Sequence, residues 1–237
     1  EFIQGDILKN DDLKNVFNGK FEAVFHFAAL KAAGESMLEP GKYATSNITG
    51  TINILNKMLE NNIKYFIFSS TAAVYGMPEY LPVDEKHPIN PINFYGYTKL
   101  AIENLLHWYS NLKGIRFGAL RYFNAAGYDM QGRIKGLEKN PANLLPVVME
   151  SAIGIRDRMD IYGDDYNTPD GTGIRDYIHV NDLAIAHVRA LNYIVENQEN
   201  LTLNLATGKG YSVLEVIKNV QEIIGKKINY KIIDRRP

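Results

Sequence analysis

Two residues with acid–base side chains, Tyr95 and Lys99, lie four positions apart in the segment YGYTK. On a helix this spacing puts both side chains on one face, where an ammonium group favours the phenolate and lowers the pKa of the phenol. Such a tyrosine can act as a general base near neutral pH. The chain contains 15 tyrosines, so a pair of this kind also arises by chance, and its meaning depends on what surrounds it.

Polar or small residues follow three predicted strands, at residues 23–28, 64–70 and 116–122. Any one of these strand ends is explained by ordinary turn formation. Because parallel strands meet a ligand at their carboxyl ends, the three together indicate a site. These residues are Phe27, Ala28, Ala29 and Lys31 at and beyond the end of the first strand, Ser69 and Thr71 at the end of the second, and Phe123 and Asn124 after the third.

The elements that must position these residues alternate between short apolar runs and amphipathic segments. Helices are predicted at 43–60 and 94–112, and this alternation predicts an α/β fold with a doubly wound parallel sheet. Beyond residue 127 the pattern loosens, with helices expected at 145–154 and 182–196 and a strand at 201–205. A capping box at Ser212 and Glu215 predicts one more helix, ended by Gly225.

The predicted organisation is a main sheet domain over residues 1–123 and a smaller mixed α/β lobe over residues 124–237. Some segments of the second part are expected to return to the main sheet. The chain does not begin with Met and opens on Phe2-Ile3, which reads as the inside of a strand. We therefore expect an interior piece of a longer protein.

Composition excludes several classes of function. The net charge is −1, with 46% hydrophobic and 22% charged residues, so no basic excess favours a nucleic-acid partner. No run of 18 apolar residues predicts a membrane span, and no signal sequence is evident. The absence of cysteine excludes disulfides and thiolate metal sites, and no histidine–carboxylate motif predicts a metal. A cytoplasmic location is expected.

Six segments, taken in order along the chain, resemble the UDP-glucose 4-epimerase family of the extended short-chain dehydrogenase/reductase superfamily. Each segment alone is a weak signal, but the ordered set is specific. The segments are HFAALKAAGES (His26–Ser36), FSSTAAVYG (Phe68–Gly76), FYGYTK (Phe94–Lys99), LRYFNAAG (Leu120–Gly127), ANLLP (Ala142–Pro146) and GTGIRDYIHVNDLA (Gly171–Ala184).

The resemblance implies a Rossmann-like domain that holds NAD tightly, a UDP-sugar substrate and a homodimer. Tyr95 is the implied base for the sugar 4-hydroxyl, Thr71 a hydrogen-bond partner of the same oxygen, and Lys99 the group that lowers the pKa of Tyr95. Hydride passes to NAD and returns to the other face of a 4-keto sugar, so that UDP-galactose and UDP-glucose interconvert.

The resemblance also implies binding residues, each carried over by its position in these segments or in four other places: the GDI segment near the start, and the surroundings of Asn47, of Tyr162 and of the chain end. The implied cofactor contacts are Asp6, Ile7, Phe27, Ala28, Ala29, Lys31, Asn47, Ser69, Tyr95, Lys99 and Phe123. The implied substrate contacts are Lys31, Thr71, Asn124, Asn143, Leu144, Tyr162, Arg175 and Arg236.

Three other interpretations are weighed against this one. A 4,6-dehydratase of the same superfamily carries Asp and Glu after the threonine, where this chain has Ala72 and Ala73, so elimination of water is disfavoured. A uronate epimerase or a decarboxylase stays open. Because no GxxGxxG turn for a dinucleotide occurs in the chain, an inactive fragment that does not hold NAD stays open as well.

Overall fold

The computed structural model describes all residues except 135, 137, 139–140 and 236–237. The chain divides into two compact units, Glu1–Phe123 with Ala184–Leu205, and Asn124–Leu183 with Ala206–Pro237. The predicted α/β class with a parallel sheet is confirmed. Among the described residues, no helix combines the length and the apolar character needed to cross a lipid bilayer.

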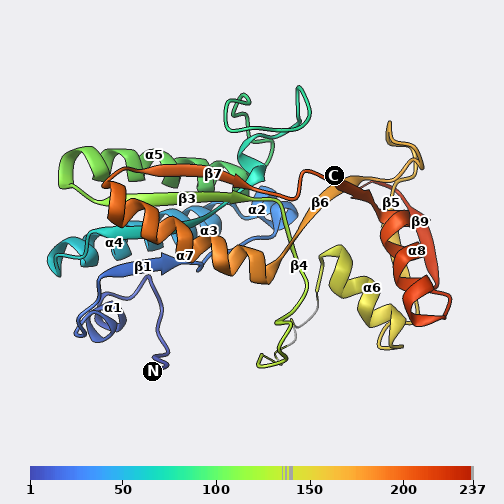
Figure 1. The fold of residues 1–237 in the computed structure, drawn as a ribbon, viewed down its shortest axis with the longest axis horizontal. Helices are drawn as coiled ribbons and strands as arrows, with labels where there is room; N and C mark the ends of the chain where they lie inside the picture. Colours follow the sequence, from blue (N-terminus) through green and yellow to red (C-terminus); the bar gives the residue numbers. More distant parts are fainter. Residues whose placement is uncertain (135, 137, 139–140, 236–237) are drawn as a thin grey trace. The chain divides into compact units, whose positions relative to one another are not determined.

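The first unit is built on a sheet of four parallel strands (Figure 1). The third and fourth strands have the predicted limits, whereas the first ends two residues early and leaves Phe27 and Ala28 beyond it. The second strand runs one residue further than predicted, to Thr71. In spatial order the strands are β1 (Ala23–His26), β2 (Tyr65–Thr71), β3 (Arg116–Tyr122) and β7 (Leu201–Leu205).

Helices cover both faces of this sheet because side chains alternate along its buried strands. Phe66 and Phe68 of β2 belong to a core that also contains side chains of α4 (Gly50–Glu60) and α5 (Phe94–Lys113). Ile67, between them, faces α7 (Val180–Asn197). Gly118 of β3 makes room on that second face, since a Cβ there would lie 3.0 Å from Ile67 and 3.6 Å from Ala190.

The helix predicted over 43–60 is broken into three parts. These are α3 (Pro40–Tyr43), a π-helical turn η1 (Ala44–Thr49) and α4. The wider turn contains Asn47, whose carbonyl accepts a hydrogen bond of 2.6 Å from the Thr51 hydroxyl. A π turn has no periodicity signal of its own in the sequence, which explains why one continuous helix was predicted.

The helix α5 begins and ends where the sequence predicts, within one residue. The Asn93 side chain caps its start by accepting from the Gly96 amide at 2.8 Å, and Gly114 ends it in the left-handed conformation with φ 73°. Gly96 is required by close packing, because a Cβ there would lie 2.6 Å from the Ala73 carbonyl oxygen. Ala73 belongs to the short 3₁₀ turn η2 (Ala72–Val74) that follows β2.

The start of the chain differs from expectation. Phe2 and Ile3 lie outside any strand, and regular structure begins at α1 (Asn10–Val16). Neither residue has a strand partner among the described residues. The prediction of a strand there rests only on the apolar character of the two side chains. After β1, the short helix α2 (Ala33–Leu38) precedes α3.

The second unit has small sheets and two packed helices. One sheet has the order β4-β6-β8, and the other pairs β5 with β9 in parallel. Its core contains Val148 of the first of these helices, Ile161 of a strand and Ile217 of the second helix. The capping box of Ser212 and Glu215 is present as predicted. The elements are β4 (Asn124–Ala126), α6 (Leu144–Ala152), β5 (Met159–Tyr162), β6 (Ile174–His179), β8 (Gly210–Ser212), α8 (Val213–Ile224) and β9 (Tyr230–Ile233).

Candidate active site

The structure brings Thr71, Tyr95 and Lys99 together at the carboxyl end of β2. Thr71 is the last residue of the strand, and its side chain lies close enough to the Tyr95 phenol to lower the pKa of that phenol. The same Thr71 oxygen accepts from the Ala73 amide at 3.1 Å, which fixes its rotamer. Tyr95 and Lys99 project from the first two turns of α5, and Gly96 lets this helix approach the turn after Thr71.

Lys99 is a buried ammonium group, only 2% exposed. Its Nζ donates to the Ser69 carbonyl at 2.8 Å and lies 4.8 Å from the centre of the Phe68 ring. Burial lowers the pKa of Lys99 to about 8, and the negative charge of Glu103 opposes that shift. Lys99 is therefore charged at neutral pH but close to losing its proton.

The pKa of Tyr95 differs from the sequence-based prediction, in which the Lys99 ammonium lowers it. In the structure burial raises the pKa of Tyr95 to about 12, with further upward contributions from Tyr122 and Tyr43, and only the Thr71 side chain lowers it. The Lys99 Nζ is 5.9 Å from the centre of the Tyr95 ring and is bonded to a backbone carbonyl instead. The predicted proximity is present, and the predicted direction of the shift is wrong for this state of the site.

Two neighbouring hydroxyls extend the polar cluster toward β3. Ser69 is hydrogen-bonded through its side chain to the phenol of Tyr122. Ser69 is 4% exposed, so its hydroxyl is buried and links the end of β2 to the end of β3. The Tyr122 ring lies 6.1 Å from His187 of α7.

The loop after β1 is anchored by side chains at alternate residues. Asn47 accepts from the Leu30 amide at 2.8 Å and donates to the Leu30 carbonyl at 3.0 Å. The Tyr43 hydroxyl accepts from the Ala32 amide at 3.1 Å and donates to the Ala32 carbonyl at 2.8 Å. Lys31, between these anchors, is exposed.

This loop fits a flat dinucleotide, the group that the resemblance implies. Phe27, at its start, exposes 57% of its surface and lies 4.8 Å from the His187 ring. Ala28 and Ala29 are small, so a ligand can approach the main chain, and the anchored backbone needs no ordering on binding. The residues present therefore suit NAD, with Phe27, Ala28 and Ala29 as surface and Lys99 as a donor.

Asn47 also connects this loop to α5. Its amide nitrogen lies 3.1 Å from the Thr98 hydroxyl, which donates to the Tyr95 carbonyl at 2.7 Å. From the other side, the Tyr95 amide donates to the Ser36 hydroxyl at 3.0 Å. The main chain of Tyr95 is thus held at both its amide and its carbonyl.

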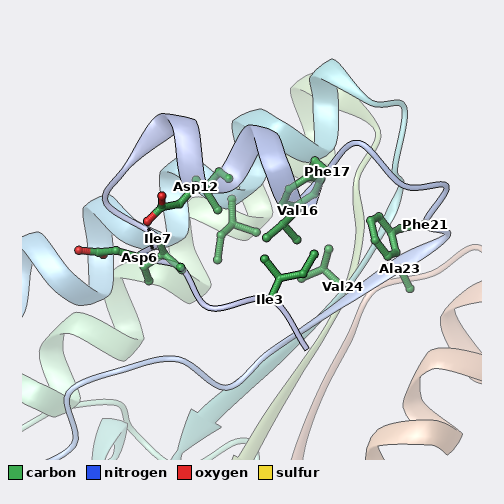
Figure 2. Close-up of a pocket in the computed structure, with 12 residues that line it drawn as sticks. Ile3, Asp6, Ile7, Asp12, Val16, Phe17, Phe21, Ala23 and Val24 are labelled. Carbon is green, nitrogen blue, oxygen red and sulfur yellow. Dashed lines mark hydrogen bonds between the residues drawn. The ribbon is translucent and has the colours of Figure 1, made fainter. Parts of the chain in front are cut away.

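Asp6 and Ile7 line a separate apolar pocket of about 310 Å³ in the first unit (Figure 2). The Asp6 carboxylate points away from the apolar interior and accepts from the Leu8 amide at 2.9 Å. Ile7 packs against the core and lies so close to Gly50 that a Cβ there would meet its Cδ1 at 2.4 Å. Their contact with the cofactor stays a prediction. Thr71, Tyr95 and Lys99 do not line this pocket.

The remaining predicted substrate residues belong to the second unit. Phe123, a predicted cofactor contact, is the last residue of the first segment of unit 1. Asn124 donates from its side chain to the Asp176 carbonyl at 2.9 Å. Arg175 is exposed and donates to the Ile174 carbonyl at 2.7 Å. Asn143 and Tyr162 are exposed, Leu144 is half-buried, and Arg236 lies outside the described residues.

Sequence reasoning missed several residues that hold the site. Tyr43 and Ser36 gave no signal, because no local spacing pattern relates them to their backbone partners, Ala32 and Tyr95. Glu103 offered one: it follows Lys99 by four positions, as Lys99 follows Tyr95, so it continues the same helix face. Among the residues that the structure describes, no group of three histidine or carboxylate side chains is arranged to hold a metal.

Comparison with known proteins agrees with this geometry. A model of the NAD dependent epimerase/dehydratase family matches residues 1–206. The UDP-glucose 4-epimerase of Halalkalibacterium halodurans is 44% identical over 236 residues, which cover 99% of this chain and 71% of that protein. The UDP-glucose 4-epimerase of Homo sapiens is 44% identical over 240 residues, covering 100% of this chain and 69% of the relative.

Solved structures give the same result. The UDP-glucose 4-epimerase of Brucella ovis in complex with NAD superposes with a TM-score of 0.95 at 42% identity, covering 100% of this chain and 73% of that one. The enzyme of Bifidobacterium longum in complex with NAD+ and UDP gives 0.90 at 42% identity, covering 98% and 70%. With a family model over most of its length and relatives above 40% identity, the chain belongs to the NAD dependent epimerase/dehydratase family.

Proposed function

We propose that the protein interconverts UDP-galactose and UDP-glucose by inverting carbon 4 of the sugar, as an NAD-dependent epimerase. The observation that carries the proposal is that Thr71 and Tyr95 lie together at the strand end, with the Lys99 Nζ 5.9 Å from the centre of the Tyr95 ring. The curated relatives are UDP-glucose 4-epimerases, and solved relatives contain NAD. A cytoplasmic location, expected from the sequence, is part of the same proposal.

In this reaction Tyr95 removes the proton from the sugar 4-hydroxyl and later returns it. A sugar hydroxyl placed between Thr71 and Tyr95 is within reach of both side chains, so both residues can bond to one oxygen. When bound, NAD supplies the hydride acceptor and donor for carbon 4 and, in its oxidised form, a positive charge. Inversion requires the 4-keto sugar to turn over before the hydride returns.

Because the pKa of Tyr95 is raised, the site with NAD bound has to lower it before Tyr95 can act as a base. With a pKa of about 12 the residue is a neutral phenol at pH 7, which cannot accept a proton. A positive charge brought close to the phenol lowers its pKa, and Lys99 contributes one as long as it is protonated. The main-chain anchors of Tyr95 keep the phenol in place while its protonation changes.

The nucleotide is proposed to bind to residues of the second unit. Arg175 offers an exposed planar guanidinium, which suits a diphosphate. Asn124, Asn143, Leu144 and Tyr162 are proposed to contact the UDP-sugar with Lys31, and Arg236 to add a second cation. Asp6, Ile7, Asn47, Ser69 and Phe123 are proposed cofactor contacts.

The turn after Thr71 favours epimerisation over elimination of water. Ala72 and Ala73 occupy this turn, so it supplies no carboxylic acid or carboxylate to catalyse elimination. A uronate epimerase or a decarboxylase is distinguished by substrate, since we expect turnover of UDP-galactose and none of UDP-glucuronic acid.

The substitution Tyr95→Phe tests the proposal. Removing the hydroxyl abolishes proton transfer, so we expect the conversion of UDP-galactose to fall by about 10²–10⁴-fold. Bound NAD, measured by absorbance after denaturation, is expected to stay near the wild-type content. The control is Tyr97→Phe, two residues on, where the ring is 51% exposed and the rate should not change.

Two results would overturn the proposal. A wild-type rate in Tyr95→Phe means that the base has been assigned to the wrong residue. Wild-type protein that carries no NAD and converts no UDP-galactose, even with NAD added, means that the chain does not act as an epimerase.

We also propose a homodimer formed through α5. Tyr97, Trp108 and Leu112 expose 51%, 64% and 68% of their surfaces on this helix. With Ala101 and Leu105 they follow the spacing of one helix face. An exposed apolar stripe of this kind is typical of a helix that packs against a second copy.

A further inference from the structure

A buried ion pair lies beneath the proposed active site. Glu103 of α5 and Arg121 of β3 expose 3% and 5% of their surfaces. Arg121 reaches both carboxylate oxygens, with Nε 3.0 Å from Oε1 and Nη2 2.5 Å from Oε2. The Ser70 hydroxyl donates to Oε1 at 2.5 Å, and Arg121 Nη1 lies 2.9 Å from the Tyr75 hydroxyl. The carboxylate thus ties a helix to two strands.

The position of this cluster relates it to the catalytic residues. Glu103 continues the helix face of Tyr95 and Lys99, one turn further along α5. Ser70 lies between Ser69, whose carbonyl holds Lys99, and Thr71, whose hydroxyl contacts Tyr95. The two residues of β2 that lie next to the catalytic pair are therefore the neighbours of the residue that Glu103 holds.

Stability alone is a weak reason for such a pair. Removing two charges from water carries a large desolvation cost, and apolar side chains of similar volume often replace a buried ion pair without loss of stability. The carboxylate has an electrostatic effect as well, since it raises the pKa of Lys99 against the effect of burial.

The other charged or titratable groups around Lys99 come from neighbouring elements. Burial, together with the nearby charge of Lys99, lowers the pKa of His26 of β1 to about 4, so this histidine is neutral near pH 7. Tyr122 of β3 is bonded to Ser69, and Tyr95 shares α5 with Lys99. Arg121 is the opposing cation. Of these groups, Glu103 is the one that supplies negative charge.

We propose that Glu103 is a positioning residue for the epimerisation. Clamped by Arg121 and bonded to Ser70, its carboxylate holds the end of β2 against α5 and favours the charged form of Lys99. The Thr71 hydroxyl and the Lys99 ammonium are thereby kept in place for Tyr95. This inference rests on the roles proposed above for Tyr95 and Lys99.

The test compares Glu103→Gln with the double variant Glu103→Leu/Arg121→Met in the NAD-loaded protein. The single variant leaves Arg121 as a buried unpaired charge and is expected to lose stability. The double variant removes both charges at similar volume and is expected to fold with a near wild-type melting temperature. Its kcat is expected to fall roughly tenfold or more with KM for UDP-galactose little changed, because displaced catalytic groups slow the chemical step.

The pH profile separates positioning from a merely structural role. Without the carboxylate Lys99 loses its proton more easily, so the alkaline limb of the kcat profile should move to lower pH. Titration of the Lys99 side-chain nitrogen by NMR should show the same shift independently of activity. The control is Glu60→Gln, which breaks the ion pair of another glutamate, with Lys57 on α4, and should leave both readouts unchanged.

A folded double variant with wild-type kcat and an unmoved alkaline limb would overturn the inference about Glu103. Tyr95→Phe is measured in the same series to separate this failure from a wider one. If Tyr95→Phe is inactive while the double variant behaves as wild type, only the role of Glu103 is lost. If Tyr95→Phe keeps the wild-type rate, the catalytic roles proposed for Tyr95 and Lys99 are wrong.

Discussion

The buried ammonium of Lys99 is needed for the proposed reaction but lowers the stability of the folded protein. The ammonium is 2% exposed, and burial lowers its pKa from 10.5 to about 8. We expect Lys99→Met to abolish epimerisation and to raise the free energy of unfolding at pH 7 by about 2 kcal/mol. This figure is the electrostatic cost of the shift less roughly 1 kcal/mol for the lost hydrogen bond to Ser69.

The pH dependence of stability gives a second check on Lys99. Between pH 8 and 10.5 the unfolded chain binds more protons at Lys99 than the folded one does, so wild-type stability should rise with pH across this window. Urea unfolding at matched NAD content should show that rise in the wild type and its loss in Lys99→Met. Lys57→Met removes a buried lysine that is paired with Glu60, and a gain in stability there would contradict the explanation.

At this scale the sequence predicts which residues meet but not how they titrate. The strand end at Thr71 and the spacing of Tyr95 and Lys99 are local patterns, and the structure brings these side chains together. The pKa of Tyr95 depends on burial and on Tyr122 and Tyr43, which no local pattern connects to it.

At the scale of elements, the contact between α5 and η2 sets the distance from Tyr95 to Thr71. A Cβ at Gly96 would lie 2.6 Å from the Ala73 carbonyl oxygen, which is backbone and cannot turn aside. We expect Gly96→Ala to push the start of α5 outward and to lower kcat by about 10- to 100-fold. Gly41→Ala is the control, because nothing lies within 4 Å of its added Cβ in α3 and activity should persist. Equal rates in both variants would contradict this role of Gly96.

Strands and caps are the elements that the sequence predicts best. The strands at 116–122 and 201–205 have their predicted limits because apolar runs bounded by turn residues are local signals. The π turn at Ala44–Thr49 was missed because it has no periodicity signal of its own, and its residue Asn47 bonds through the side chain to Leu30 and Thr98, which are distant in sequence.

At the scale of the whole molecule, the exposed stripe on α5 predicts the oligomeric state. We expect Trp108→Glu to weaken the proposed dimer at least roughly 30-fold, because an aromatic anchor in an interface is typically worth about 2 kcal/mol or more. Light scattering over a range of concentrations measures this change. Ile223→Glu on α8, at a residue 84% exposed, is the matched control and should not affect assembly. Wild-type protein that is monomeric at every concentration would rule out the dimer.

The anchored loop after β1 has a consequence for the evolution of ligand preference. Asn47 and Tyr43 hold Leu30 and Ala32 through main-chain atoms alone, so the loop keeps its path whatever side chains it carries. Substitutions at Ala28 or Lys31 can therefore alter what the surface accepts while the scaffold under it stays intact. Selection for a new nucleotide or sugar can act there at little risk to folding.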